Sequence, residues 1–225
     1  MVNIVYTNHR CKDVFRVFKT QHDKHCTLPL HVISDYEGDT VYDENTPYYT
    51  HWLTALNSIE SEYFIYNQED FILYDDVNVE RLNEYKNVLE ANPKYSFIRL
   101  LKSGKNLGEQ RIHRDLYETT LTSYPLYSMQ ATLWRKDRFV ELYSLTKQDK
   151  WFECEAYETA CEELNIEGLY HYSGESSRGG HFDSNVYPYT ATAVVRGMWN
   201  FREYEKELQP LLEAHQIDYN IRGIF

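Results

Sequence analysis

The stretch YFIYNQED, residues 63–70, decides the fold, because an apolar run passes directly into two adjacent acids. A second apolar run, FILY, and the pair Asp75-Asp76 follow it. Carboxylates at the end of a buried strand are costly to desolvate unless a partner such as a divalent cation neutralises them. Ligands of open α/β sheets collect at the carboxyl ends of strands. The stretch therefore predicts a strand whose end holds a metal and, through the metal, a phosphate.

Length and composition favour a folded α/β protein. The chain has 225 residues, which suits one large domain or two small ones, and its hydrophobic fraction of 42% is enough for a real core. With 21 tyrosines, 10 phenylalanines and 4 tryptophans, some aromatic surface is left for stacking on bases or sugar rings. The net charge of −12, without a long basic run, argues against nucleic acid as a partner, because phosphate neutralisation needs clustered cations.

The chain shows no targeting or membrane signal that we can recognise. No apolar run is long enough to span a bilayer, and MVNIVYTNHR at the start is typical of a strand. The cysteines Cys11, Cys26, Cys154 and Cys161 lack zinc spacing, which indicates free thiols in a reducing compartment. We therefore expect a cytoplasmic protein without a transmembrane segment, and the oligomeric state stays open.

Apolar periodicity predicts alternating strands and helices in the first hundred residues. Strands are expected at 3–7, 30–34, 63–66 and 95–101, with helices at about 48–60 and from the cap Asn78 to Asn92; the segment between the first two strands is treated as a connection. This order predicts a mixed, mainly parallel sheet flanked by helices.

The second half of the chain is less regular. We expect a hairpin or excursion at 104–128, a strand at 128–134, a helix capped by Asp137, a helix at about 151–164, an exposed loop at 171–186 and a last helix capped by Asn200. The short segments 197–199 and 219–223 are assigned to packing. One domain, 1–225, is the simplest organisation.

The two acids Glu69 and Asp70 are the candidate metal ligands. Mg²⁺ and Mn²⁺ prefer oxygen ligands and are often held by one or two carboxylates together with phosphate oxygens. The alternative is that both acids are solvated turn residues of an acidic protein.

An apolar strand that ends in acids behind an N-terminal nucleotide-binding half resembles the DxD strand of GT-A-fold glycosyltransferases, particularly the small bacterial and viral ones. The matching residues are Gln68-Glu69-Asp70, and Gln68 departs from the pattern because it replaces the first Asp with a neutral amide. The resemblance implies a nucleotide-binding half, 1–103, and an acceptor-side half, 104–225. It also implies Mn²⁺ or Mg²⁺ as cofactor, a nucleotide-sugar donor and a hydroxyl acceptor.

Further site residues follow from the same resemblance. Thr7 and Asn8 at the end of the first strand, and Asp35 at the end of the second, are expected near the nucleotide together with the acidic pair. Glu153 and Glu155 fall where the family places its catalytic acid, with Glu155 preferred as the base that accepts the proton of the acceptor hydroxyl.

Two of these assignments have a plain structural alternative. Glu155, Glu158 and Glu162 have the spacing of an ordinary solvated helix face. His181 is a candidate third metal ligand in a loop that closes over the donor, but most loops of this composition are simply exposed.

The function that these residues favour is sugar transfer from a nucleotide-diphospho-sugar to a hydroxyl. A non-catalytic nucleotide- or sugar-binding module stays open because of Gln68. Another metal-dependent phosphoryl-transfer enzyme is also possible, although such enzymes use more converging carboxylates.

Overall fold

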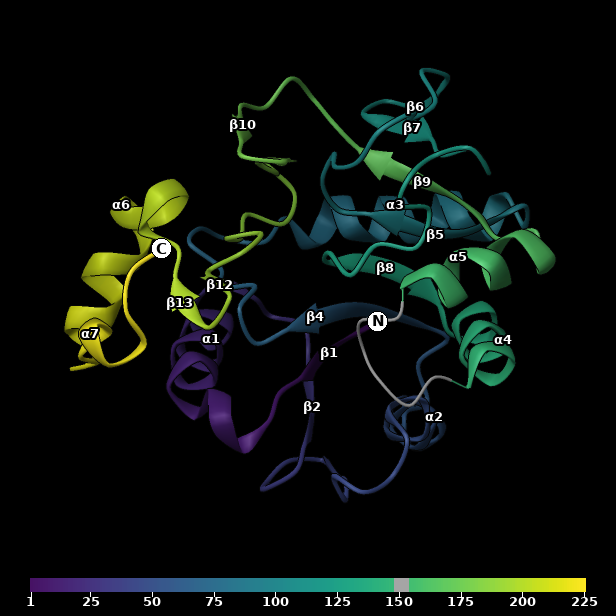
Figure 1. The fold of residues 1–225 in the computed structure, drawn as a ribbon. Coiled ribbons are helices and arrows are strands. Elements are labelled where there is room, and N and C mark those ends of the chain that lie inside the picture. Colours follow the sequence, from purple (N-terminus) through teal and green to yellow (C-terminus); the bar gives the residue numbers. More distant parts are fainter. Residues whose placement is uncertain (148–153) are drawn as a thin grey trace.

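The architecture is a nine-stranded mixed sheet with helices on both sides (Figure 1). The computed structural model describes residues 1–147 and 154–225, apart from the side chains of 154 and 155. The sheet order is β3-β2-β1-β4-β8-β5-β9-β7-β6. Its strands are β1 (Val2–Tyr6), β2 (Leu30–Ser34), β3 (Thr40–Val41), β4 (Tyr63–Gln68), β5 (Tyr95–Arg99), β6 (Arg111–His113), β7 (Leu116–Glu118), β8 (Thr132–Arg135) and β9 (Glu167–His171).

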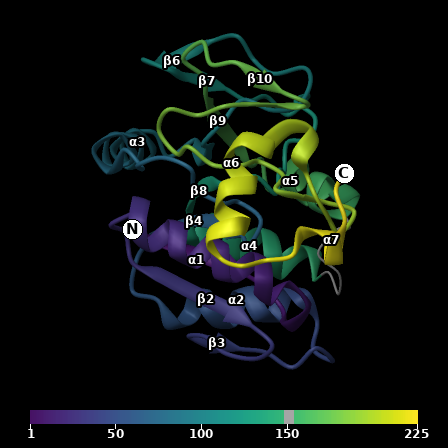
Figure 2. The same ribbon diagram turned by 90° about the vertical axis from the view of Figure 1, so that its left-hand side faces the viewer.

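Most strands of this sheet run in one direction. β1 pairs in parallel with both β2 and β4, and β5 pairs in parallel with β9. Only β8 and β7 run against the others in the nine-stranded sheet, so the prediction of a mixed, mainly parallel sheet is confirmed. Figure 2 shows β3 and β6 at opposite edges.

Alternate residues of the central strands enter two separate cores. Ile4 packs in one cluster with Trp52 of α2 (Tyr48–Ser58). Its neighbour Val5 belongs to a second cluster with Phe18 of α1 (Lys12–His25). Side chains of a strand alternate between faces, so the buried strand must be apolar on both sides. The continuous apolar runs in the sequence have this cause.

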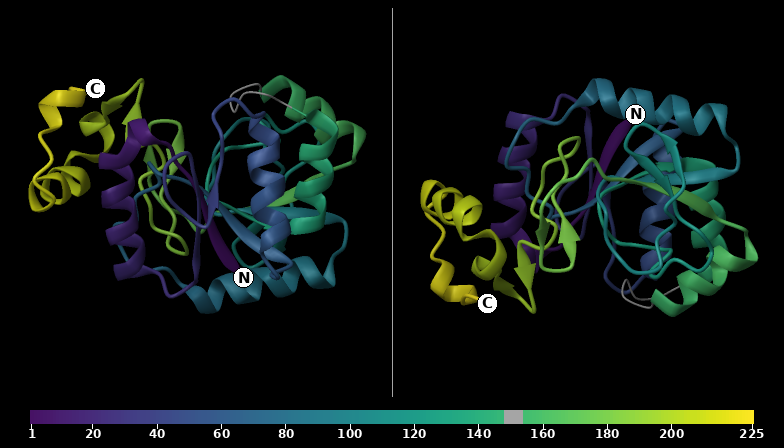
Figure 3. Two further views of the ribbon diagram at one scale, coloured as in Figure 1. Left: turned by 90° about the horizontal axis from the view of Figure 1, so that it is seen from below. Right: turned by 90° about the horizontal axis from the view of Figure 1, so that it is seen from above.

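The helices are divided between these two faces (Figure 3). On one side lies α1 with α6 (Phe201–Ala214) and the short α7 (Tyr219–Arg222); on the other lie α2, α4 (Lys136–Thr146) and α5 (Cys154–Glu163). α3 (Val79–Ala91) packs beside β5. The expected caps Asn78 and Asn200 are confirmed, since their side chains accept hydrogen bonds from Arg81 N and Glu203 N.

Several local predictions were wrong. The connection between the first strands is the helix α1, which periodicity missed because its buried face continues through the polar residues Gln21 and His22. The cap of α4 is Arg135 and not Asp137. The expected loop 171–186 contains a hairpin of β10 (Ser177–Arg178) and β11 (His181–Phe182).

The described cysteines Cys11, Cys26 and Cys161 are free.

A second small hairpin, β12 (Val194–Val195) with β13 (Met198–Trp199), precedes α6. Among the described residues, none of the helices has both the length and the apolar composition needed to cross a bilayer.

Candidate active site

The candidate site lies where the chain changes direction in the sheet. From β1 the chain passes through α1 to β2 on one side, and then returns to β4 on the other side of β1. Such a reversal leaves a crevice at the carboxyl ends of the two central strands. Gln68, Glu69 and Asp70 end β4 at this crevice.

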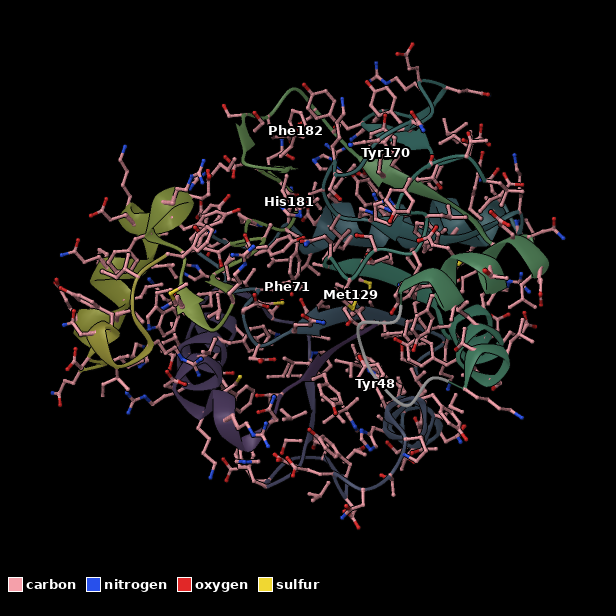
Figure 4. All side chains as sticks on the ribbon, viewed as in Figure 1. Tyr48, Phe71, Met129, Tyr170, His181 and Phe182 are labelled. Atoms are coloured by element: carbon pink, nitrogen blue, oxygen red, sulfur yellow. The ribbon has the colours of Figure 1, made fainter. Side chains whose placement is uncertain are left out.

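Two adjoining hollows open at the end of β4. The first hollow, about 380 Å³, is bordered by Asn8, Tyr48 and Glu69 on the side of β1 and α2. The second hollow, about 340 Å³, is bordered by residues that include Met129 and His181. Gln68 and Asp70 line both, and therefore form the wall between the hollows. In Figure 4, Phe71, Met129 and His181 mark the second hollow, and Tyr48 the first.

The acidic pair is half-buried, and both carboxylates are difficult to ionise. Burial, and then repulsion from Glu69, raise the pKa of Asp70 to about 8. Burial also raises the pKa of Glu69, although the Cys11 thiol and the charge of Arg222 oppose that change. Because desolvation is the largest cause of both shifts, ionising the two carboxylates together is unfavourable unless a cation binds to them.

This donor set fits a hard divalent cation. Two neighbouring carboxylates that are unfavourable when ionised become favourable once a cation lies between them and phosphate oxygens. Glu69 and Asp70 would hold that ion. His181 does not form a cluster of possible ligand atoms with them among the described residues, although it borders the second hollow together with Asp70.

His181 has a different set of neighbours. Its Nε2 lies 3.1 Å from Nε2 of Gln130, whose carbonyl oxygen accepts a hydrogen bond of 2.9 Å from the Tyr189 hydroxyl. Burial, and then the charge of Arg99, lower the pKa of His181, which favours the neutral imidazole. Its role as a metal ligand stays a prediction.

Gln68 is fixed by its neighbours. Its amide nitrogen donates to the Tyr66 hydroxyl at 2.9 Å and lies 3.8 Å from the Met129 sulfur. Since the amide nitrogen is used in this way, the carbonyl oxygen is left as an acceptor at the wall between the hollows. The neutral residue Gln68 is thus held in place by Tyr66 and Met129.

Two arginines border the first hollow. Arg222 lies in a segment that was expected to serve packing, and Arg196 had no predicted role. Arg196 is exposed at the tip of the β12–β13 hairpin and has a positive φ of 52°. Arg222, at the end of α7, also lines this hollow and donates to both carboxylate oxygens of Asp13 at 2.6 Å. Cationic side chains thus face the acidic pair across the hollow, and no local sequence signal indicated this.

The residues predicted to contact the nucleotide are placed unequally. Asn8 lines the first hollow, whereas Thr7 is fully buried and its hydroxyl has no hydrogen-bond partner among the described residues. Asp35 accepts hydrogen bonds from the backbone and the ring of His9, and it does not border the first hollow. Burial would raise the pKa of Asp35, but the hydrogen bonds from His9 hold it below its usual value.

The two candidate catalytic acids lie at the edge of the part of the chain that the structure describes. Glu153 lies outside the described residues, and of Glu155 the structure gives only the backbone, in α5. One carboxylate of this helix, Glu158, turns inward. It accepts hydrogen bonds of 2.9 and 2.8 Å from the backbone nitrogens of Leu126 and Tyr127, so it is not part of a solvated face.

Comparison with solved structures identifies the fold. The chain matches the crystal structure of S. aureus TarS 1–349 with a TM-score of 0.50 and 13% identity, over 96% of this chain and 66% of that one. The resemblance drawn from residues 68–70 is confirmed at the level of the fold, which is GT-A-like. This is the fold class of transferases that use nucleotides and nucleotide sugars.

Two further solved structures are similar at a lower level. CMP:2-keto-3-deoxy-manno-octonic acid synthetase in complex with CTP matches 75% of this chain and 88% of its own, with 11% identity and a TM-score of 0.42. The 4-diphosphocytidyl-2C-methyl-D-erythritol synthase of Anaerococcus prevotii matches 76% and 84%, with 11% identity and a TM-score of 0.43. No protein-family model matches the sequence, and no curated protein does.

Proposed function

We propose that the protein is a glycosyltransferase that moves a sugar from a nucleotide-diphospho-sugar to a hydroxyl acceptor with the help of Mn²⁺ or Mg²⁺. The observation that carries this proposal is the half-buried acidic pair Glu69–Asp70 at the switch point of a GT-A-like sheet, beside a hollow of about 380 Å³.

Each part of the first hollow has a role in this proposal. Tyr48 and Tyr6 offer aromatic surface to the base or ribose, next to Asn8. Glu69 and Asp70 hold the metal, which when bound neutralises the diphosphate leaving group. Arg196 and Arg222 add charge-assisted hydrogen bonds to the same phosphates. Binding energy from the nucleotide, remote from the reacting carbon, orients the sugar.

The base for the acceptor hydroxyl remains Glu155, with Glu153 second. The backbone of Glu155 lies in the first described turn of α5, and carboxylates near a helix N-terminus are stabilised by free backbone N–H groups and by the helix dipole. Support for this assignment comes from the neighbouring Glu158, which ties α5 to the segment beside the second hollow.

The proposal is tested by thermal shift with UDP, GDP and CMP, each with and without Mn²⁺, followed by donor hydrolysis. One nucleotide should stabilise the protein in a metal-dependent way, and Asp70→Ala should abolish that dependence. Glu60→Ala, which changes an exposed acid that borders neither hollow and belongs to no cluster of possible metal ligands, serves as the control. Nucleotide binding without turnover on any donor would favour a binding module, and phosphodiester cleavage would favour a phosphoryl-transfer enzyme.

A further inference from the structure

The second hollow is adjacent to the predicted reaction centre but differs from the first in its chemistry. It shares Gln68 and Asp70 with the first hollow, so a molecule bound in it would lie next to the sugar of a bound donor. Transfer requires the attacking hydroxyl and the anomeric carbon to approach to about 3–3.5 Å. The second hollow is therefore in the right place for an acceptor.

Positive charge is missing from the wall of this hollow. Among its described lining residues, Asp70 is the one carboxylate, and no lysine or arginine occurs. Arg99 lies behind the wall with no exposed surface. It donates at 2.6 Å to the carbonyl of Ser103 and at 2.8 Å to that of Pro125, so its charge is used to hold the two segments that form the wall.

An anionic acceptor would thus find no lysine or arginine in the wall, and the charge of a metal held by Glu69 and Asp70 would already be balanced by these carboxylates and the diphosphate. Its desolvation would therefore be unfavourable. Uncharged hydroxyl groups would meet suitable partners: the carbonyl oxygen of the Gln68 amide and the hydroxyl of Ser128. Phe71 and Met129 add apolar surface for the C–H face of a sugar ring. Mostly apolar surface with a few placed polar groups is the usual composition of a small-molecule site, and 340 Å³ is within the usual range of roughly 300–1,000 Å³.

We propose that the second hollow is the acceptor subsite and that it selects an uncharged saccharide over phosphorylated or carboxylated sugars. This inference rests on the proposed transferase function, and it adds the class of acceptor. The basis of this inference is the difference in charge between the two hollows. The first hollow suits a diphosphate, and the second hollow disfavours anionic ligands.

The test measures saccharide affinity after the nucleotide has been identified by thermal shift. With that nucleotide and Mn²⁺ bound, methyl glycosides of glucose, galactose and mannose are titrated by saturation-transfer NMR against the matching sugar 6-phosphates and uronic acids. We expect at least one neutral glycoside to bind about tenfold or more tightly than its charged counterparts.

A charge-introducing variant makes the test independent of which sugar is best. Ser128 lines the second hollow and its side chain makes no hydrogen bond to another described residue, so Ser128→Lys should shift the neutral-to-anionic affinity ratio by about tenfold toward the anions. Ser144→Lys makes the same charge change on the exposed side of α4 and should leave the ratio unchanged.

A last arm separates the acceptor from the sugar of the donor itself. If the glycoside still binds when an unreactive 2-fluoro nucleotide-sugar replaces the nucleotide, the hollow is the acceptor subsite; displacement by the donor overturns that assignment. Preference for sugar phosphates, or failure of every neutral glycoside while the nucleotide still binds, overturns this inference alone. Loss of nucleotide binding as well would mean that the proposed function itself has failed.

Discussion

The two hollows share one wall, yet they present opposite surfaces to a ligand. The first contains two carboxylates and, across from them, Arg196 and Arg222, whereas the second contains uncharged amides, hydroxyls and apolar side chains beside Asp70. The difference shows how one strand end serves two ligands. Gln68 and Asp70 are common to both, so specificity must come from the segments that surround them: α7 and the β12–β13 hairpin on one side, the β10–β11 hairpin and the residues before β8 on the other.

The largest effect is expected from the residue that belongs to both hollows. Asp70→Asn should reduce sugar transfer by roughly a thousandfold, because a metal supplies several kcal/mol of charge stabilisation. The isosteric amide should leave the fold intact, as checked by circular dichroism. A transfer rate within tenfold of the wild-type rate would show that Asp70 does not hold the metal. The first hollow could then no longer be distinguished from the second as the metal and diphosphate site.

A second variant acts on the second hollow alone. Arg99→Met removes the donors to the carbonyls of Ser103, Pro125 and Leu126, and should lower the free energy of unfolding by about 3 kcal/mol or more, as unsatisfied buried acceptors cost about 1–3 kcal/mol each. Urea denaturation measures this loss.

A matched substitution gives the baseline for this loss. Arg135→Met changes an arginine that borders neither hollow and makes one long hydrogen bond, to Leu89 O at 3.3 Å, so it should cost under about 1 kcal/mol. In Arg99→Met that remains folded, saccharide binding should weaken while nucleotide binding persists. Equal losses of saccharide affinity and nucleotide affinity would contradict the conclusion that Arg99 supports the second hollow alone.

The arginines of the first hollow provide a smaller effect that separates binding from stability. Arg196→Ala should weaken a nucleoside diphosphate about tenfold, the value of one charge-assisted hydrogen bond, with nucleoside affinity and melting temperature unchanged. Arg222→Ala should do the same and also destabilise the fold, because it leaves Asp13 unpaired. Calorimetry with Arg202→Ala, an exposed arginine of α6, gives the baseline; an equal loss there would contradict a specific role.

The last effect concerns pH. The pKa of Asp70 is raised to about 8 in the folded state, so below its ordinary value both folded and unfolded chains bind the proton, and above it the unfolded chain ionises more easily. Metal-free protein should therefore lose stability on account of Asp70 as pH rises from about 4 to about 8. The difference in melting temperature between wild type and Asp70→Asn should grow over that window and shrink when Mn²⁺ is added; a flat difference would contradict the shift.

The local parts of this picture were readable from the sequence. The ends of β1, β2 and β4 follow from apolar runs that stop at polar residues, and residues 68–70 indicated both the fold and the place of the candidate site. Local pattern sufficed because each of these signals lies within a few consecutive residues.

What the sequence did not show depends on long-range contacts. Arg222 reaches the first hollow because it pairs with Asp13, and the spacing of neither residue indicates the other. The contact of His181 with Gln130 depends on the β10–β11 hairpin, which the sequence did not indicate. The helix α1 escaped detection because a buried Gln21 and His22 interrupt its apolar pattern. In each case tertiary packing, and not local propensity, decides the outcome.

The pairing of Arg222 with Asp13 joins positions 209 residues apart. On the ribosome, β1 and α1 are made early, but the first hollow lacks this wall until Arg222 has been synthesised and has left the exit tunnel. With the proposed nucleoside diphosphate as ligand, a product shortened before α7 would bind more weakly than a chain that contains α7. Ligand binding would therefore protect the shortened product less against unfolding.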